Sequence, residues 1–251
     1  MSAPAARFAG DIPAHYDSGL GPVLFADYAQ DLARRAAARK PVRVLEVAAG
    51  TGIVTQMLRD ALPASSDLVA TDLSPSMLAI ARRKFAAGER IEFRAADAAA
   101  LPFADGDFDA LVCQFGVMFF PDKDRAYREA YRVLARAGRY HFSVWDSFEF
   151  NAFARIAHET VGVFFDDDAP DFFTVPFGYH CIDTIKASLI RAGFADISAH
   201  VLRIATTVSH ARRLADGLIL GNPIVDEIDA RARRSWRCGA RGRRCRQSPR
   251  E

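Results

Sequence analysis

The sequence predicts an α/β fold built on one mostly parallel, doubly wound sheet. Short β-rich runs alternate with helical stretches between residues 42 and 145, and a glycine-rich turn joins the first run to a helix. Such alternation is typical of parallel strands whose crossover helices cover both faces of the sheet. The chain has 251 residues, half of them hydrophobic, which suits one large domain with a full core.

The first half of this pattern is the most regular. VRVLEV at Val42–Val47 has the composition of a buried strand, and the helix Ile53–Leu62 follows its turn. Leu68–Leu73 is the second expected strand. The next helix, Pro75–Phe85, has Ser74 as its N-cap and proline at its first position. Ile91–Ala95 is the third strand.

The second half continues with the expected strand Phe108–Phe115. The helix Asp124–Leu134 follows, because its apolar residues recur at i, i+3, i+4 and i+7, and Arg139–Trp145 is a fifth strand. After Trp145 the pattern loosens. We still expect a helix at Ile182–Ala192, ended by Gly193, and a strand at Ile197–Thr207.

These elements predict a single domain over residues 1–230. Residues 40–146 form its ligand-binding core, and residues 147–180, rich in phenylalanine, form a helical cap. Residues 231–251 hold nine arginines and one acid, a net charge of +8, so the first 230 residues carry −6 of the total of +2. This mildly acidic body does not suggest nucleic acid as the main partner.

Several function classes are unsupported. The longest apolar run, Leu111–Phe120, is too short to span a bilayer, and Met1–Gly10 lacks the features of a secretory signal. The four cysteines show no zinc spacing. The acidic run Asp166–Asp168 stands alone in one loop, so we expect no metal site. A cytoplasmic enzyme is the resulting expectation.

Three features at successive strand ends point to a nucleoside ligand. The first strand runs into Glu46-Val47-Ala48-Ala49-Gly50-Thr51-Gly52, where glycines let a ligand approach the backbone. Thr55 stands where a dinucleotide turn would have its third glycine, which disfavours an NAD-dependent dehydrogenase. Asp72 can accept hydrogen bonds from ribose hydroxyls, and Asp97 from an adenine amino group. Alternatively, the turn is purely structural, Asp72 caps a helix and Asp97 is a loop residue.

Four segments in this order resemble the class I S-adenosylmethionine-dependent methyltransferases: VLEVAAGTG, LVATDLSPSMLAIARRK, FRAADAAALPFADGDFDALVCQFGVMFFPD and EAYRVLARAGRYHFSVW. They look like the small-molecule, ubiquinone/menaquinone-biosynthesis (UbiE-like, type 11) branch. The resemblance implies S-adenosylmethionine as cofactor and strand order 3-2-1-4-5-(7)-6. Ala48 departs from the family pattern, which has glycine there.

The resemblance also implies a role for each matching residue. Glu46 would reach the methionine part of the cofactor, and Ala48, Gly50 and Gly52 would line it. Asp72 would hold the ribose. The remaining contacts would come from Leu73 and Met77 on the adenine face, Asp97 and Ala98 at its amino edge, Gln114 and Phe115 at the sulfonium end, and Tyr16 in a segment that closes over the cofactor. For Leu73 and Met77, plain core packing is an almost equal alternative.

The acceptor is predicted as a small organic molecule methylated on oxygen or carbon. The fourth strand is followed by Gly116-Val117-Met118-Phe119-Phe120, without the N/D-P-P-Y/F tetrapeptide of enzymes that methylate DNA bases or glutamine. Phenylalanines in Phe148–Phe177 could roof an apolar acceptor site or form the core of the cap. No catalytic residue is assigned. The candidate bases are Tyr16, His15, His141, His158 and His180, and each histidine is more simply a structural residue.

The arginine-rich tail allows two interpretations. A polybasic arm could touch RNA or anionic lipid, which would suit a nucleic-acid-modifying enzyme. We favour a frameshift near residue 230 that replaces the last strand and leaves sheet edges exposed. A catalytically silent S-adenosylmethionine-binding protein with a damaged C-terminus is therefore the main alternative function.

Overall fold

The computed structural model describes residues 8–165 and 168–233. Its centre is a sheet of five parallel strands in the order β3-β2-β1-β4-β5. The strands are β1 (Arg43–Val47), β2 (Asp67–Asp72), β3 (Ile91–Ala95), β4 (Phe108–Gln114) and β5 (Leu134–Ser143). This confirms the α/β class and the first five positions of the expected order. β5 begins five residues earlier than Arg139, where we expected it.

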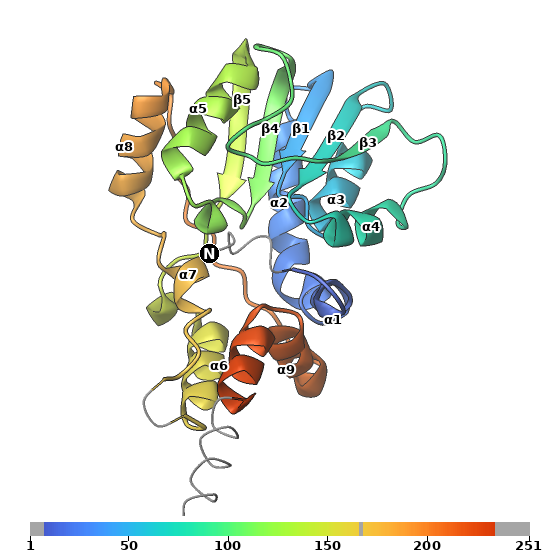
Figure 1. Ribbon diagram of the computed structural model, residues 1–251. Helices are drawn as coiled ribbons and strands as arrows, with labels where there is room; N and C mark the ends of the chain where they lie inside the picture. Colours follow the sequence, from blue (N-terminus) through green and yellow to red (C-terminus); the bar gives the residue numbers. More distant parts are fainter. Residues whose placement is uncertain (1–7, 166–167, 234–251) are drawn as a thin grey trace, which may run out of the picture.

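Helices cover both faces of the sheet (Figure 1). On one face α2 (Ala26–Ala37) and α3 (Ile53–Ala61) bury alanine, leucine and valine against the central strands. On the other face lie α5 (Lys123–Val133) and α8 (Ile182–Ala192). The helix α4 (Pro75–Arg82) begins as predicted, because the Ser74 hydroxyl accepts a hydrogen bond from the Met77 N–H at 3.3 Å.

The remaining helices gather at the carboxyl ends of the strands (Figure 1). They come from the N-terminal segment and from the chain after β5: α1 (Ile12–Gly19) and the π-helical turn η2 (Gly21–Phe25), then α6 (Ala152–Gly162), α7 (Thr174–Phe177) and α9 (Ala211–Leu220). Two short 3-10 turns, η3 (Val117–Phe119) and η4 (Phe148–Phe150), complete the set. This end of the molecule therefore joins distant segments over one edge of the sheet.

The prediction of a strand at Ile197–Thr207 is wrong. The segment has no strand conformation, and nearly all of its residues are exposed. An extended segment becomes a strand only when a neighbour accepts and donates its backbone hydrogen bonds. In the expected order a seventh strand would lie between this segment and β5. The described residues contain no such strand, so β5 is the edge of the sheet.

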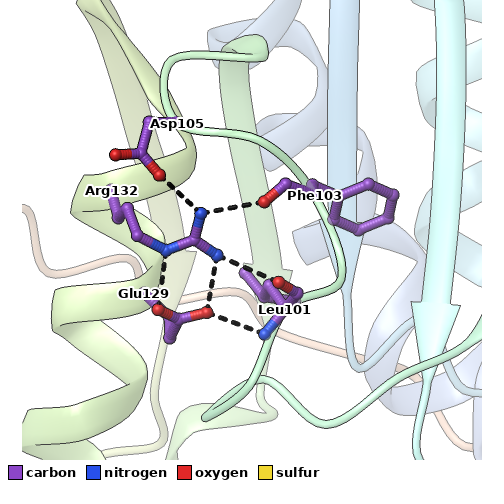
Figure 2. A network of polar contacts seen from close by, with 5 residues as sticks. All are labelled: Leu101, Phe103, Asp105, Glu129 and Arg132. Atoms are coloured by element: carbon purple, nitrogen blue, oxygen red, sulfur yellow. Dashed lines mark hydrogen bonds and ion pairs between the residues drawn. The ribbon is translucent and has the colours of Figure 1, made fainter.

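A charged network holds the loop between β3 and β4 against α5 (Figure 2). The Arg132 guanidinium donates to the carbonyls of Leu101 and Phe103 at 2.9 and 2.8 Å, and to the carboxylates of Asp105 and Glu129 at 2.8 Å. Glu129 in turn accepts from the Leu101 N–H at 2.8 Å. The loop that follows Asp97 is therefore fixed to a helix on the sheet.

The predicted tail lies mainly outside the described residues. Residues 224–233 form a helix, so the first positions of the segment 231–251 are ordered. Arg231 donates from Nε to the Asp168 carbonyl at 2.6 Å. Residues 234–251 lie outside the described residues, so the hypothesis of a frameshift near residue 230 stays a prediction. Within the described ranges, no helix combines the length and the apolar character needed to cross a membrane.

Candidate functional site

The turn from β1 to α3 leaves an open cradle at the carboxyl edge of the sheet. Gly50 and Gly52 have left-handed φ angles of +56° and +83°. A Cβ on Gly52 would lie 2.8 Å from the Cβ of Ala81, whereas a Cβ on Gly50 would meet nothing within 4 Å. Gly52 is therefore required for packing against α4, and Gly50 borders free space that a ligand could fill.

Asp72 ties this turn to β2. One carboxylate oxygen accepts from the Gly50 N–H at 2.8 Å, and the other accepts from the Ser74 N–H at 2.7 Å. Burial raises the pKa of this carboxyl, although the backbone N–H donors favour its charged form. Each carboxylate oxygen can accept a second hydrogen bond, so Asp72 keeps the capacity to bind hydroxyl groups.

Asp97 stands at the same edge, after the next strand. Ala95 is the register partner of Asp72, and the Ala96 N–H donates to the Asp72 carbonyl at 3.1 Å. The exposed Asp97 carboxylate accepts from the Ala99 N–H at 2.8 Å, while Ala98 is half-buried beside it. The structure thus brings the turn and both aspartates to one rim, as the sequence predicted from strand order.

Glu46 is the most buried acidic side chain at this rim, with 2% of its surface exposed. Its carboxylate accepts from the Thr55 hydroxyl at 2.6 Å. Burial raises its pKa to about 8, and the nearby charge of Asp72 acts in the same direction. Thr55, singled out because it replaces a glycine, therefore anchors Glu46; the contact of Glu46 with a cofactor stays a prediction.

Gln114 and Phe115 end β4 beside the turn. The Gln114 amide donates from Nε2 to the Phe25 carbonyl at 3.0 Å, and its Oε1 is buried with no partner among the described residues. Phe115 has a φ of +50° and stacks on Trp145, their ring centroids 3.9 Å apart. An unpartnered buried acceptor is costly unless a ligand supplies the donor.

Leu73, Met77 and Tyr16 differ in exposure. Leu73 is 38% exposed, whereas Met77 is buried in a core cluster with residues of the N-terminal segment. Tyr16 lies on α1, half-buried and stacked on Phe25 at 5.2 Å. Burial raises the pKa of its phenol, and the negative charge of Asp72 adds to this. The carboxylate of Asp72 therefore contributes to the raised pKa of Tyr16.

The residues at this rim fit an S-adenosylmethionine molecule. Gly50 borders free space, Asp72 retains acceptor capacity towards ribose hydroxyls, and Gln114 Oε1 lacks a donor that an ammonium group would supply. When bound, this cofactor supplies a methyl group on a sulfonium, so the protein has to provide position and not an electrophile.

An aromatic cavity of about 70 Å³ adjoins Phe115 and Tyr16. Its other walls come from the N-terminal segment, the end of η3, the segment after β5, the cap, and α9 with the residues that follow it. They are Phe8, Leu20, Leu24, Phe25, Phe119, Trp145, Phe153, Phe172, Phe173, Pro176, Phe177, Leu218 and Asn222. Four of the cap phenylalanines that we expected in a roof thus line it. The contributions of Phe8, Trp145 and Leu218 carried no local signal in the sequence.

The histidine candidates lie elsewhere. None of His15, His141, His158 and His180 is among the residues that line the cavity. His141 is half-buried in β5, where burial lowers its pKa and the nearby Arg139 and Arg35 lower it further. His158 stacks on Phe148, and His180 contacts the Phe177 carbonyl. The described residues therefore supply no histidine base at the cavity.

Comparison with known proteins gives the family. The methyltransferase domain family matches residues 44–138. The demethylmenaquinone methyltransferase of Thermus thermophilus is 48% identical over 102 residues, which are 40% of this chain and 46% of the relative. The chain thus spans about half of the length of that protein. The ubiquinone/menaquinone biosynthesis C-methyltransferase UbiE of Escherichia coli is 30% identical over 188 residues, 68% of this chain and 74% of the relative.

Solved structures agree on the fold. A SAM-dependent methyltransferase from Thermotoga maritima superposes with a TM-score of 0.50 at 21% identity, covering 68% of this chain and 73% of that protein. The chain also has the five parallel strands in the order expected of this family, with a glycine turn and acidic residues at two strand ends. It belongs to the class I S-adenosylmethionine-dependent methyltransferases of the UbiE type.

Proposed function

We propose that the protein transfers a methyl group from S-adenosylmethionine to an oxygen or carbon of a small, apolar, ring-shaped acceptor. The observation that carries this proposal is the aromatic cavity beside Phe115 and Tyr16, because an acceptor must lie next to the sulfonium end of the cofactor. The names of the relatives, demethylmenaquinone and ubiquinone/menaquinone methyltransferases, favour a quinone-type acceptor.

The chain's own residues would contribute position and exclusion of water. Asp72 and the turn at Gly50 hold the ribose and methionine parts, and Gln114 Oε1 accepts from the ammonium group. Aromatic walls keep the reacting atoms dry, which strengthens electrostatic interactions around the moving charge. An acceptor that is already ionised, or an activated carbon, would require no base. This suits a cavity whose described lining includes none of the four histidine candidates, whereas Tyr16, the remaining candidate base, does line it.

A cytoplasmic setting is part of the same proposal. Cys113 and Cys181 are free thiols, as is usual in reducing compartments.

Calorimetric titration of the full chain with S-adenosylhomocysteine tests cofactor binding. We expect Asp72→Ala to weaken it by about 1–3 kcal/mol, because ligand hydroxyls lose their acceptor. Asp109→Ala is the matched control. Asp109 also accepts from two backbone N–H groups, those of Val42 and Arg43 at 2.9 Å, but precedes Ala110 near the start of β4. Equal affinity of the Asp72 and Asp109 variants would exclude Asp72 from the site.

Turnover is tested with methyl-labelled S-adenosylmethionine and a reduced, short-chain demethylated naphthoquinone. Label in the quinone product is the expected result. Tight binding of the cofactor without label in this or any phenolic probe would instead favour the catalytically silent alternative.

A further inference from the structure

We propose that Asn222 determines which acceptor the aromatic cavity takes, by requiring an O–H or N–H donor on an otherwise apolar ring. Asn222 follows α9, lines the cavity and is 7% exposed. Apart from the Asn222 amide, the Tyr16 hydroxyl and the Trp145 indole N–H, the side chains that line the cavity are apolar, and among these three groups only the amide has an oxygen that solely accepts. A side-chain amide in such a wall is costly to bury unless its polar atoms are hydrogen-bonded.

The orientation of the amide follows from its contacts. Nδ2 donates to the carbonyls of Gly217 at 3.3 Å and Leu218 at 3.0 Å. Because both partners are carbonyl oxygens, only the nitrogen can face them, and Oδ1 is directed away from the end of α9. No donor in the described part of the chain hydrogen-bonds to Oδ1. The cavity wall therefore presents an acceptor oxygen without a partner.

Close backbone packing fixes this position. A Cβ on Gly221, the residue before Asn222, would lie 2.7 Å from the Tyr16 nitrogen and 2.9 Å from the Tyr16 Cα. A Cβ on Gly19 would lie 2.6 Å from the Gly217 Cα. The helices α1 and α9 therefore touch through glycines, and Figure 1 shows them side by side. This contact holds Asn222 and Tyr16 on the same wall.

The chemistry of the ligand follows from these groups. The aromatic walls favour a ring. Because Oδ1 can only accept a hydrogen bond, a hydroxyl or N–H group on that ring would bind it. A ring with no donor would leave Oδ1 buried and unpaired, which costs binding energy. This inference rests on the proposed function only in treating the cavity as the acceptor site.

The test uses phenol and fluorobenzene, which have similar size but differ in the donor, as probes in ligand-observed NMR titrations. We expect Asn222→Leu to lower the preference for phenol over fluorobenzene by about tenfold. Asn151→Leu is the matched control. Asn151 is 8% exposed and also donates from Nδ2 to two carbonyls, but it does not line the cavity.

Three results would overturn the proposal: no phenol binding by the unmodified chain, an unchanged preference in Asn222→Leu, or equal losses in both variants. A second measurement uses the unmodified chain, so it tests the proposal even if a variant fails to fold. The Asn222 Cγ resonance should shift with phenol and not with fluorobenzene, and equal shifts would contradict the proposal. The probes need no cofactor, so phenol selectivity without S-adenosylhomocysteine binding would refute the proposed function alone.

Discussion

Ala48 stands in the cofactor turn with a left-handed φ of +54°, where its family has glycine. Such a conformation costs an L-residue roughly 1–2 kcal/mol. Its Cβ also occupies space: a Cβ on Gly116 would lie 2.5 Å from it and 2.8 Å from the Cys113 Sγ. The glycine at position 116 therefore accommodates the alanine at position 48, so the two residues form a complementary pair across the ends of β1 and β4.

This pair predicts a coupled response to substitution. Gly116→Ala should lower the free energy of unfolding by about 1–3 kcal/mol, because the added methyl group clashes with Ala48. In an Ala48→Gly background the same substitution should cost less, by on the order of 1 kcal/mol, since only the contact with Cys113 remains. Urea denaturation of the four chains measures the coupling. Additive effects would show that the residues do not compensate each other.

Glu46 predicts a pH dependence of stability. Its pKa is raised from 4.5 to about 8 in the folded chain. Between these values the folded protein holds a proton that the unfolded chain has released, so the free energy of unfolding falls as the pH rises. The slope for one such group is at most about 1.4 kcal/mol per pH unit.

Glu46→Gln keeps an acceptor for the Thr55 hydroxyl but cannot ionise. Its unfolding free energy should therefore fall less steeply than that of the unmodified chain between pH 5 and 8. Denaturation series at several pH values measure the unfolding free energies of both chains. Other titrating groups such as Asp72 contribute equally to both, so their contributions cancel in the difference. Parallel curves for the two chains would show that Glu46 is ionised in the folded state throughout.

At the scale of elements, the network around Arg132 predicts how the β3–β4 loop is held (Figure 2). Arg132→Met keeps much of the side-chain length but removes every donor. The carbonyls of Leu101 and Phe103 lose the guanidinium, and Glu129 keeps only the Leu101 N–H. We expect a loss of about 1–3 kcal/mol in unfolding free energy. Arg139→Met is the control, since its ion pair with Asp196 at 3.3 Å is exposed and should contribute little. Equal losses would contradict a special role for Arg132.

Elements were predictable where their signal was local. β3 and α8 have the predicted bounds, since β-rich composition marks the strand and the terminal Gly193 marks the end of the helix. The segment 197–207 has the composition of a strand but no neighbour to pair with, and pairing is not encoded locally. The contacts of Arg132 were also missed, because they join a loop to a helix about 30 residues away.

At the scale of the whole molecule, the rim was predictable and the cavity was not. Gly50, Asp72 and Asp97 follow successive strands, and the topology of a parallel sheet brings them together. The cavity instead needs residues from both ends of the chain, such as Phe8 and Asn222, and their meeting depends on tertiary packing. We therefore expect the proposed acceptor site to depend on the contact of α1 with α9.

Gly217→Val tests this dependence directly. A Cβ at Gly217 would lie 2.9 Å from backbone atoms of Gly19 and from Leu20 Cδ2, so valine must push α9 away from α1. Phe8 and Leu218 would then lose contacts in the cluster they share, whereas the sheet and its other helices lie outside this contact. We expect phenol affinity to fall at least about tenfold, while circular dichroism stays near that of the unmodified chain.

Gly162→Val is the control for this prediction. A Cβ on that helical glycine would meet nothing within 4 Å, so the variant should bind phenol normally. Equal losses of phenol affinity in the two variants would point to a general effect of valine in a helix and not to the α1–α9 contact. Retained phenol affinity in Gly217→Val would mean that the acceptor site forms without this contact, and that the core and cap alone suffice to build it.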